Sequence, residues 1–358
     1  MKILMLSTFP PQKCGVGIYT YDLVNALRKL KNKVIVVSNK PCDADYIIDF
    51  KSSSLVSNVK KIIEKEKPDV VHIQYQAVLY SSLLNQNLVS LLKKVNIPAV
   101  VTLHEVQYWV RTKSPIQQLK LKVLQYMERR VVKNASKVIV HTPNQQKFLT
   151  KKYKTNKVEC IYMGLHLKKA KRKKQGKNIL FFGMLNSGKG VEYLIRAMRS
   201  LPDFKLVVAG RAVKRPYKEL LIKEAKGLSN VKLNIGWIPE KVKQKYYEKT
   251  DIVVLPYVWA PYQSAVLHDA FSYGLPVVVT KAGAVWEIVK VFRCGEVVEA
   301  GSPKAIADGV KKVFLDYNYY KKGIAQYREE ANWRQVAKKH SNLYSRLYKR
   351  TSSSFIIS

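Results

Sequence analysis

Apolar positions in the first half of the chain follow two alternating patterns. Short continuous runs of Val, Ile and Leu predict buried strands at residues 3–7, 33–37, 70–73, 98–103 and 138–141. Between these runs, residues 18–30 and 55–65 carry apolar side chains at helical spacing. Strands that alternate with helices are typical of a doubly wound parallel sheet, so we expect an α/β domain.

The second half repeats this alternation. Its strands are predicted at residues 178–182, 204–209, 231–235, 251–255 and 276–280. Helical spacing recurs at residues 191–200, 218–226, 303–317 and 332–349. Because 358 residues suffice for two separate cores, we predict a second α/β domain followed by helices.

Between the halves the apolar pattern breaks off. Residues 165–177 are mostly Lys and Arg without apolar periodicity, which is typical of a domain linker. We therefore predict a first domain at residues 1–164 and a second at 178–330. A final helix at 331–350 and a short tail at 351–358 complete the chain.

The segment from residue 251 to residue 289 is the most informative about function. A predicted strand leads into a loop that contains Gln263 and Ser264, a helix ends at Gly274, and a second strand leads to Gly283. In an open parallel sheet such loops lie at the carboxyl ends of the strands, where helix N-termini present free N–H groups to anions. The segment predicts a phosphate-binding site.

A glycine-rich turn follows the first strand of the second half. It runs from Gly183 to Gly190, includes Gly188, and places Lys189 beside the start of a helix. An ammonium group fixed next to free amides is suited to hold a leaving diphosphate. The turn is not a nucleotide-triphosphatase loop, because Gly190 stands where that motif needs Ser or Thr. The alternative interpretation is a solvated surface lysine.

Similar features follow strands of the first half. Gly15 and Gly17 form a second glycine-rich turn, where the backbone allows close approach of a ligand. His104 ends the strand at residues 98–103, and His72 ends the strand at 70–73. Sites assemble at carboxyl ends of strands, so these residues are candidates, although a tight turn and structural histidines would explain them equally.

The composition adds a strong positive charge. Lys and Arg number 64 against 25 Asp and Glu, a formal net charge of +39, which indicates a polyanionic neighbour. Four scattered cysteines indicate neither a zinc site nor a disulfide framework, so we expect a reducing, cytoplasmic location. The first residues predict a strand rather than a signal peptide, and no apolar run reaches the ~20 residues that span a bilayer.

With these motifs the chain resembles the family 4 glycosyltransferases, enzymes that transfer a sugar from a nucleotide diphosphate. Four features fall in register with the family: Gln263-Ser264, the segment that begins at Gly274, Ala282-Gly283 and Glu287. The resemblance implies the GT-B fold, in which two Rossmann-like doubly wound domains face each other across a cleft. It also implies that the C-terminal helix crosses back to pack on the first domain.

The chain departs from the family pattern at three positions. The family's pair of glutamates falls on Pro261 and Asp269, and an expected arginine falls on Met184. The chain thus looks like a Gln-Ser variant of the family, in which Arg211 or Lys281 would replace the missing arginine.

The resemblance also implies roles for individual residues. Sugar transfer would retain the anomeric configuration, with His104 and Lys189 as catalytic residues, and would need neither a cofactor nor a metal. The expected donor-binding residues are Gly183, Gly188, Gln263, Ser264, Asp269, Gly283 and Glu287. Those expected on the acceptor side are Gly15, Gly17 and His72.

A basic amphipathic helix at residues 115–133 indicates where the acceptor is met. Its apolar stripe comprises Ile116, Leu119, Val123, Met127 and Val131, and its remaining face carries Lys120, Lys122, Arg129, Arg130 and Lys133. Such a helix is typical of a membrane-surface element. We therefore expect the protein to bind peripherally to the inner face of an anionic membrane, and to use a lipid-linked or glycan acceptor. The alternative is a stripe that packs on its own sheet.

Three other function classes stay open. The charge also fits a nucleic-acid-associated protein or an enzyme that glucosylates nucleic-acid bases, although no reading motif is found. A same-fold epimerase or phosphorylase would need residues that the sequence lacks. Pro261 and Met184 leave room for a non-catalytic partner subunit.

Overall fold

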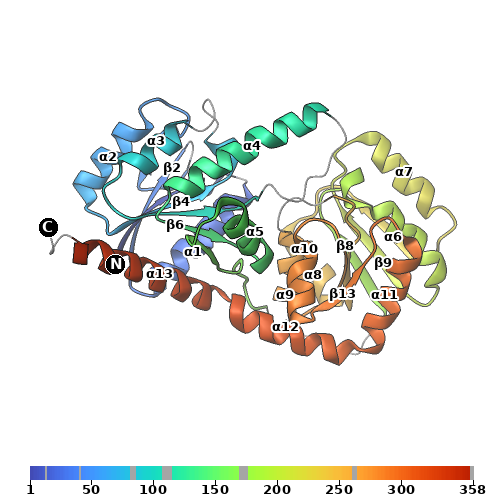
Figure 1. Ribbon diagram of the computed structural model, residues 1–358. Coiled ribbons are helices and arrows are strands. Elements are labelled where there is room, and N and C mark those ends of the chain that lie inside the picture. Colours follow the sequence, from blue (N-terminus) through green and yellow to red (C-terminus); the bar gives the residue numbers. More distant parts are fainter. Residues whose placement is uncertain are drawn as a thin grey trace. The chain divides into compact units, whose positions relative to one another are not determined.

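A computed structural model describes residues 1–12, 14–39, 42–80, 86–106, 115–168, 176–259 and 264–354. The chain divides into two compact units (Figure 1). Unit 1 comprises residues 1–164 and 333–358, and unit 2 comprises residues 165–332. The C-terminal segment therefore belongs to the unit that the N-terminus begins.

A parallel sheet of seven strands forms the centre of unit 1, in the order β3-β2-β1-β4-β5-β6-β7. These strands are β1 (Lys2–Leu6), β2 (Lys33–Ser38), β3 (Tyr46–Ile47), β4 (Val70–Tyr75), β5 (Ala99–Leu103), β6 (Lys137–Val140) and β7 (Val158–Cys160). Both faces of the sheet are covered, because two separate sets of buried apolar side chains flank it. The order reverses between β1 and β4, where doubly wound sheets bind ligands.

Helices cover the two faces of this sheet. They are α1 (Gly15–Lys29), α2 (Leu55–Glu66), the short 3₁₀ turn η1 (Ala77–Leu79), α3 (Gln86–Lys94), α4 (Pro115–Asn134), α5 (Pro143–Tyr153) and α13 (Trp333–Ser354). Of the predicted stripe of α4, Met127 and Val131 are buried. Ile116, Leu119 and Val123 are exposed, so only the C-terminal half of α4 packs on the sheet.

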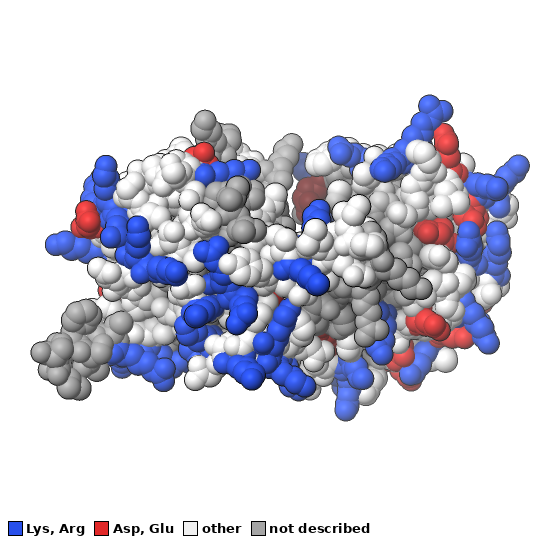
Figure 2. Space-filling model, turned by 45° about the horizontal axis from the view of Figure 1, so that its top comes forward, with Lys and Arg blue, Asp and Glu red and all other residues white. Residues whose placement is uncertain are grey.

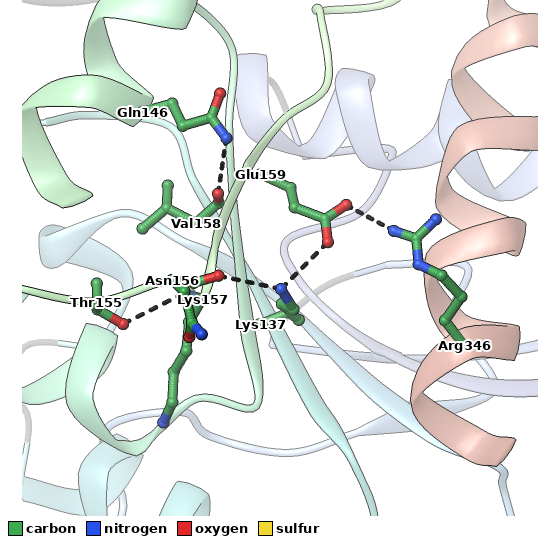
Figure 3. A network of polar contacts seen from close by, with 8 residues as sticks. All are labelled: Lys137, Gln146, Thr155, Asn156, Lys157, Val158, Glu159 and Arg346. Atoms are coloured by element: carbon green, nitrogen blue, oxygen red, sulfur yellow. Dashed lines mark hydrogen bonds and ion pairs between the residues drawn. The ribbon is translucent and has the colours of Figure 1, made fainter. Parts of the chain in front are cut away.

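The last helix, α13, completes the core of unit 1 by packing against α1. Val336, Ala337, Leu343 and Tyr344 are buried in the same apolar cluster as the strand residues Ile3 and Met5, an arrangement that hydrophobic burial stabilises. On its outer side, Arg346 donates to Glu159 of β7 at 2.8 Å, and Glu159 also pairs with Lys137 of β6 at 3.3 Å (Figure 3). These contacts agree with the predicted C-terminal helix that returns to the first domain.

Unit 2 contains a second parallel sheet, of six strands in the order β10-β9-β8-β11-β12-β13. Its strands are β8 (Asn178–Phe182), β9 (Lys205–Gly210), β10 (Val231–Ile235), β11 (Ile252–Leu255), β12 (Val277–Thr280) and β13 (Gly295–Val298). Its helices are η3 (Ser187–Lys189), α6 (Val191–Ala197), η4 (Met198–Ser200), α7 (Arg215–Ala225), α8 (Glu240–Lys249), α9 (Ala265–Ser272), α10 (Val285–Phe292), α11 (Pro303–Leu315) and α12 (Tyr317–Ala331). The two doubly wound sheets confirm the predicted α/β architecture.

Candidate functional site

The glycine turn of unit 2 is anchored to β9. Gly183 N–H donates to Ala209 at 3.0 Å, and Leu185 N–H donates to Arg211 at 2.9 Å. Gly210 has to be glycine here, because an added Cβ would lie 1.8 Å from the carbonyl oxygen of Gly183. The turn is therefore held at the carboxyl edge of the sheet, where ligand sites of such folds form.

The same turn is joined to the loop after β11. The carbonyl oxygen of Gly188 accepts hydrogen bonds from the N–H groups of Val258 and Trp259, both at 3.1 Å. Gly190 has φ +60°, and an added Cβ would lie 2.2 Å from the carbonyl oxygen of Pro256. Glycine at this position lets the two loops approach closely and turns the chain into α6.

Lys189 extends from this turn over an aromatic ring. Its ammonium nitrogen lies 3.7 Å from the centroid of Tyr257, a cation–π contact. Burial lowers the pKa of Lys189 to about 8, because a poorly solvated ammonium loses its proton more readily. Within the described part of the chain, no carboxylate lies within 4 Å of this group. Lys189 is thus a half-buried cation that no acid of the described segments neutralises.

The ring of Tyr257 links Lys189 to the start of α9. Its hydroxyl group lies 3.1 Å from the hydroxyl oxygen of Ser264, which is the N-cap of α9 and accepts from Leu267 N–H at 3.4 Å. A cation and the N-terminus of an α-helix are thereby positioned through a single side chain. Both features attract anions. Gln263, the other half of the predicted pair, lies outside the described residues, as does Pro261.

Asp269 lies on α9 but faces α8. Its carboxylate pairs with Lys243 at 2.8 Å, and the Lys243 ammonium lies 5.7 Å from the ring centroid of Phe182, at the end of β8. Burial raises the pKa of Asp269, and Lys243 lowers it. The carboxylate expected to bind a ribose thus has a cationic partner in the ligand-free protein.

The remaining donor-side residues lie after β12. Gly283 has φ +60°, which suits glycine, and Glu287 is 1% exposed in the first turn of α10. Of the two cations expected to replace the missing arginine, Arg211 belongs to the strand end that holds the Gly183 turn. Lys281 instead lies 5.9 Å from the ring centroid of Trp286 and lines a separate cavity of about 390 Å³ beside β13.

In unit 1, a chain of buried polar side chains leads from α13 to His104. The Tyr344 hydroxyl lies 2.6 Å from Nδ1 of His72, and Nε2 of His72 lies 2.8 Å from the Thr102 hydroxyl oxygen. Gln74 lies 3.4 Å from His72 and 2.8 Å from Nε2 of His104. His72 is fully buried, so it cannot contact an acceptor directly; its link toward the half-buried His104 runs through Gln74.

His104 itself is half-buried at the carboxyl end of β5 and packs edge-on against Tyr19, with ring centroids 4.9 Å apart. Burial first, and then His141, lower its pKa well below the usual value, so its ring is neutral near pH 7. A neutral imidazole whose Nε2–H donates to Gln74 Oε1 has Nδ1 as its acceptor, so it can accept one hydrogen bond from a sugar hydroxyl, but it is not a cation.

The two glycines after β1 differ in their surroundings. An added Cβ at Gly15 would meet nothing within 4 Å, so the space there is open. At Gly17 it would lie 3.4 Å from the backbone of Thr8, so this glycine serves close packing between α1 and the β1 loop.

Gln74 follows His72 on β4 and was an acceptor-side candidate with it, whereas the sequence did not single out two residues that organise these sites, Tyr257 and Lys243. Each acts through a partner distant in sequence, which no local pattern marks. Among the described residues, no group of three or more His, Cys, Asp or Glu side chains could hold a metal ion. None of the described helices is both long enough and apolar enough to cross a membrane.

Comparisons with known proteins assign both halves of the chain to sugar-transferring families. Residues 14–169 match the family described as Glycosyltransferase Family 4, and residues 165–330 match Glycosyl transferases group 1. An uncharacterised glycosyltransferase of Methanocaldococcus jannaschii is 34% identical over 175 residues, which are 47% of this chain and 44% of the relative. Phosphatidyl-myo-inositol mannosyltransferase of Mycobacterium leprae is 27% identical over 140 residues, 38% of this chain and 36% of the relative. The matched segments thus span less than half of each relative.

A solved structure extends the likeness to nearly the whole chain. Anabaena HepE in complex with UDP has a TM-score of 0.69 at 19% identity, over 97% of this chain and 100% of that chain. The same protein in complex with UDP-glucose has a TM-score of 0.71. At such identity the likeness concerns the fold alone, and the GT-B fold predicted from the sequence is confirmed.

Proposed function

This chain belongs to the glycosyltransferases of group 1 and family 4, and we propose that it transfers a sugar from a nucleotide diphosphate sugar to an acceptor, with retention of anomeric configuration. The observation that carries the proposal is the position of Lys189. The ammonium group lies above Tyr257, in the glycine turn at the carboxyl end of β8, and has no neutralising carboxylate among the described residues.

The chemistry follows from where negative charge develops. As the bond between the anomeric carbon and the diphosphate oxygen breaks, the leaving diphosphate gains charge. Lys189 would meet that charge without reorganising, together with those N–H groups of the Gly183–Gly190 turn that do not donate within the protein, which is an efficient form of transition-state stabilisation. Arg211 is the cation placed to assist, because its backbone fixes the same turn. In this proposal His104 contacts the transferred sugar through its neutral ring.

The donor that we propose to try first is a uridine diphosphate sugar. Anabaena HepE, which shares the fold, was solved with UDP and with UDP-glucose. Ser264, Asp269, Gly283 and Glu287 are the described residues that we assign to donor binding. Asp269 would exchange Lys243 for ribose hydroxyl groups when the nucleotide enters.

For the acceptor we propose a lipid-linked substrate, met by a peripherally bound protein. The formal net charge of +39 is far larger than a few substrate phosphates would balance. The Mycobacterium leprae relative bears the name of an enzyme that mannosylates a phospholipid. The exposed basic half of α4 supplies a surface suited to such a partner.

Replacing Lys189 by Met tests the donor side. We expect nucleotide-sugar turnover to fall by about 10²- to 10³-fold, the range for loss of one preorganised charge-stabilising group. Lys205→Met is the matched control, because Lys205 is exposed at the opposite end of the same sheet. Turnover that survives intact in Lys189→Met would exclude the mechanism. Binding of UDP without any turnover in the parent protein would instead identify a non-catalytic partner subunit.

A further inference from the structure

A cavity of about 540 Å³ lies between α4 and α5 in unit 1, whereas the proposed donor residues belong to unit 2. Its lining consists of Lys122, Gln125, Tyr126, Arg129, Lys152, Tyr153 and Lys154. Four of these seven side chains are cations, contributed by two different helices. None is an acid.

One buried acid, Glu128, opposes part of the positive charge of this cavity, since it acts electrostatically on Lys152. The nearby acid Glu128 is 2% exposed and accepts a hydrogen bond from the Tyr153 hydroxyl at 2.7 Å. Within the described parts of the chain, none of the four cations has a carboxylate within ion-pairing distance. Four cations around one cavity favour a ligand with concentrated negative charge, such as a phosphate.

Apolar side chains lie next to this cavity on the same helix. Ile116 is 81% exposed, Leu119 65% and Tyr126 51%. At 100° per residue, these positions and Val123 share one face of α4 with the buried Met127, and Lys122 and Arg129 lie directly beside them. Tyr126 belongs to both sets. α4 lies on the outside of unit 1 beside α3, with one end extending past its neighbours (Figure 1).

A contiguous apolar surface beside concentrated positive charge is unusual on a protein that contacts only water. Free phosphate would use the cations and leave the apolar side chains exposed, and a nucleic acid backbone would do the same. An anionic lipid uses both, since its phosphate meets the cations and its acyl chains meet the apolar side chains. Lys and Arg side chains also predominate over Asp and Glu on the face shown in Figure 2.

We propose that the cavity between α4 and α5 binds the phosphate of an anionic membrane phospholipid, while Ile116, Leu119 and Val123 enter the acyl boundary. The inference deepens the membrane association in the proposed function, on which it rests, by naming the residues and the lipid chemistry. It assigns docking to unit 1 and leaves the donor residues of unit 2 uninvolved. Each cation at the cavity would contribute about fivefold to membrane affinity.

Co-sedimentation of the full chain with vesicles tests the site. The vesicles contain phosphatidylcholine alone or phosphatidylcholine mixed with phosphatidylglycerol. One variant combines Arg129→Glu with Lys152→Glu, and another combines Ile116→Ser with Leu119→Ser. The control combines Lys304→Glu with Lys311→Glu, which changes net charge equally on exposed positions of α11 in unit 2.

We expect the parent and the control to bind the mixed vesicles, and the two unit 1 variants to lose at least tenfold in affinity. Equal binding to pure phosphatidylcholine would overturn the proposal. So would an equal loss in the control, which would indicate net charge alone, or full binding by the apolar variant, which would indicate a phosphate site without insertion. A gel shift with duplex DNA that added vesicles leave unchanged would overturn the proposal in favour of a nucleic-acid partner.

A thermal shift with UDP, measured on the same variants, separates this inference from the proposed function. All these substitutions lie at exposed positions outside the donor residues, so the UDP shift should persist in every variant. Vesicle binding without any UDP shift in the parent would refute the donor assignment and leave the lipid site standing. A UDP shift in the parent without vesicle binding would refute the lipid site and leave the donor assignment standing.

Discussion

The ammonium nitrogen of Lys189 lies 3.7 Å from the centroid of the Tyr257 ring. Lys189 follows β8 and Tyr257 follows β11, so the contact joins two neighbouring strands of the unit 2 sheet at their carboxyl ends. An aromatic face attracts a cation without neutralising it, unlike a carboxylate. The lysine is therefore fixed in place, and its charge stays available to a ligand.

The first prediction concerns the pH dependence of UDP binding. Lys189 has a pKa of about 8, so the free protein loses this proton as the pH rises from 7 to 9. A diphosphate binds the protonated form and raises this pKa, and its terminal phosphate is already ionised above pH ~7. We expect the Kd of UDP to increase by up to about tenfold per pH unit above pH 8.

Isothermal titration calorimetry at several pH values measures this effect. In Lys189→Met the Kd of UDP at pH 7 should be larger than in the parent protein, and it should vary little between pH 7 and 9. A steep pH dependence that persists in this variant would mean that another group titrates, and the assignment of Lys189 to the diphosphate would fail.

The second prediction separates backbone strain from steric overlap at Gly190. An alanine there would adopt φ +60° and place its Cβ 2.2 Å from the Pro256 carbonyl oxygen. Gly227→Ala is the matched control, because φ is +82° and nothing lies within 4 Å. We expect Gly227→Ala to cost about 1–2 kcal/mol in the free energy of unfolding. Gly190→Ala should cost clearly more and weaken UDP binding. Equal losses in urea unfolding would show that the two loops separate easily.

The sequence predicted most of the sheet architecture because short continuous runs of Val, Ile and Leu mark buried strands. It missed α8, since six of the ten residues from Glu240 to Lys249 are charged and apolar periodicity is weak. α8 is held by tertiary packing, for example the buried Tyr247 stacked on Tyr273. As a consequence, Lys243 could not be identified as the partner of Asp269.

Site residues were predictable where a local motif places them, as for Lys189 in its glycine turn. Site residues were not predictable where contacts between segments distant in the sequence decide the geometry. Tyr257 occurs in a plain strand-end sequence, and nothing local indicates that its ring underlies Lys189. The amphipathic stripe of α4 was visible from Ile116 to Val131, but periodicity cannot tell that its first half extends beyond the packed surface.

The third prediction distinguishes a ligand role of Asp269 from a structural role. If the carboxylate binds ribose, Asp269→Asn should weaken UDP binding by about tenfold, the loss expected for a charge-assisted hydrogen bond. Lys243→Met should leave UDP affinity unchanged or improve it, because the competing ammonium is gone. Calorimetry on both variants gives the comparison. Equal weakening by the two substitutions would indicate that the ion pair only supports the fold.

The fourth prediction concerns acid stability. Burial lowers the pKa of His340 and His268 to about 4, and lowers those of His72 and His104 well below 6.5. The unfolded chain therefore binds more protons below pH 6.5, and stability falls as the pH decreases through that value. Three of these histidines lie in unit 1 and one in unit 2.

Between pH 7 and pH 5 we expect both units to lose stability, and unit 1 to lose more, because three of these four histidines lie in it. His340 and His268, whose pKa values are about 4, should each contribute on the order of 2 kcal/mol. Limited proteolysis across a urea gradient, with the resistant fragments identified by mass spectrometry, follows each unit separately. Greater acid sensitivity in unit 2 would contradict the burial assigned to these rings.

The return of α13 to unit 1 has a consequence for biosynthesis. The chain leaves unit 1 after residue 164 and re-enters it at residue 333, and Leu165 N–H meets Ala331 at 2.9 Å where the two passages run together. Val336, Leu343 and Tyr344, which complete the apolar interior around α1, are translated after the whole of unit 2. On a ribosome, unit 2 can therefore fold before α13 has been synthesised and the apolar core of unit 1 is complete.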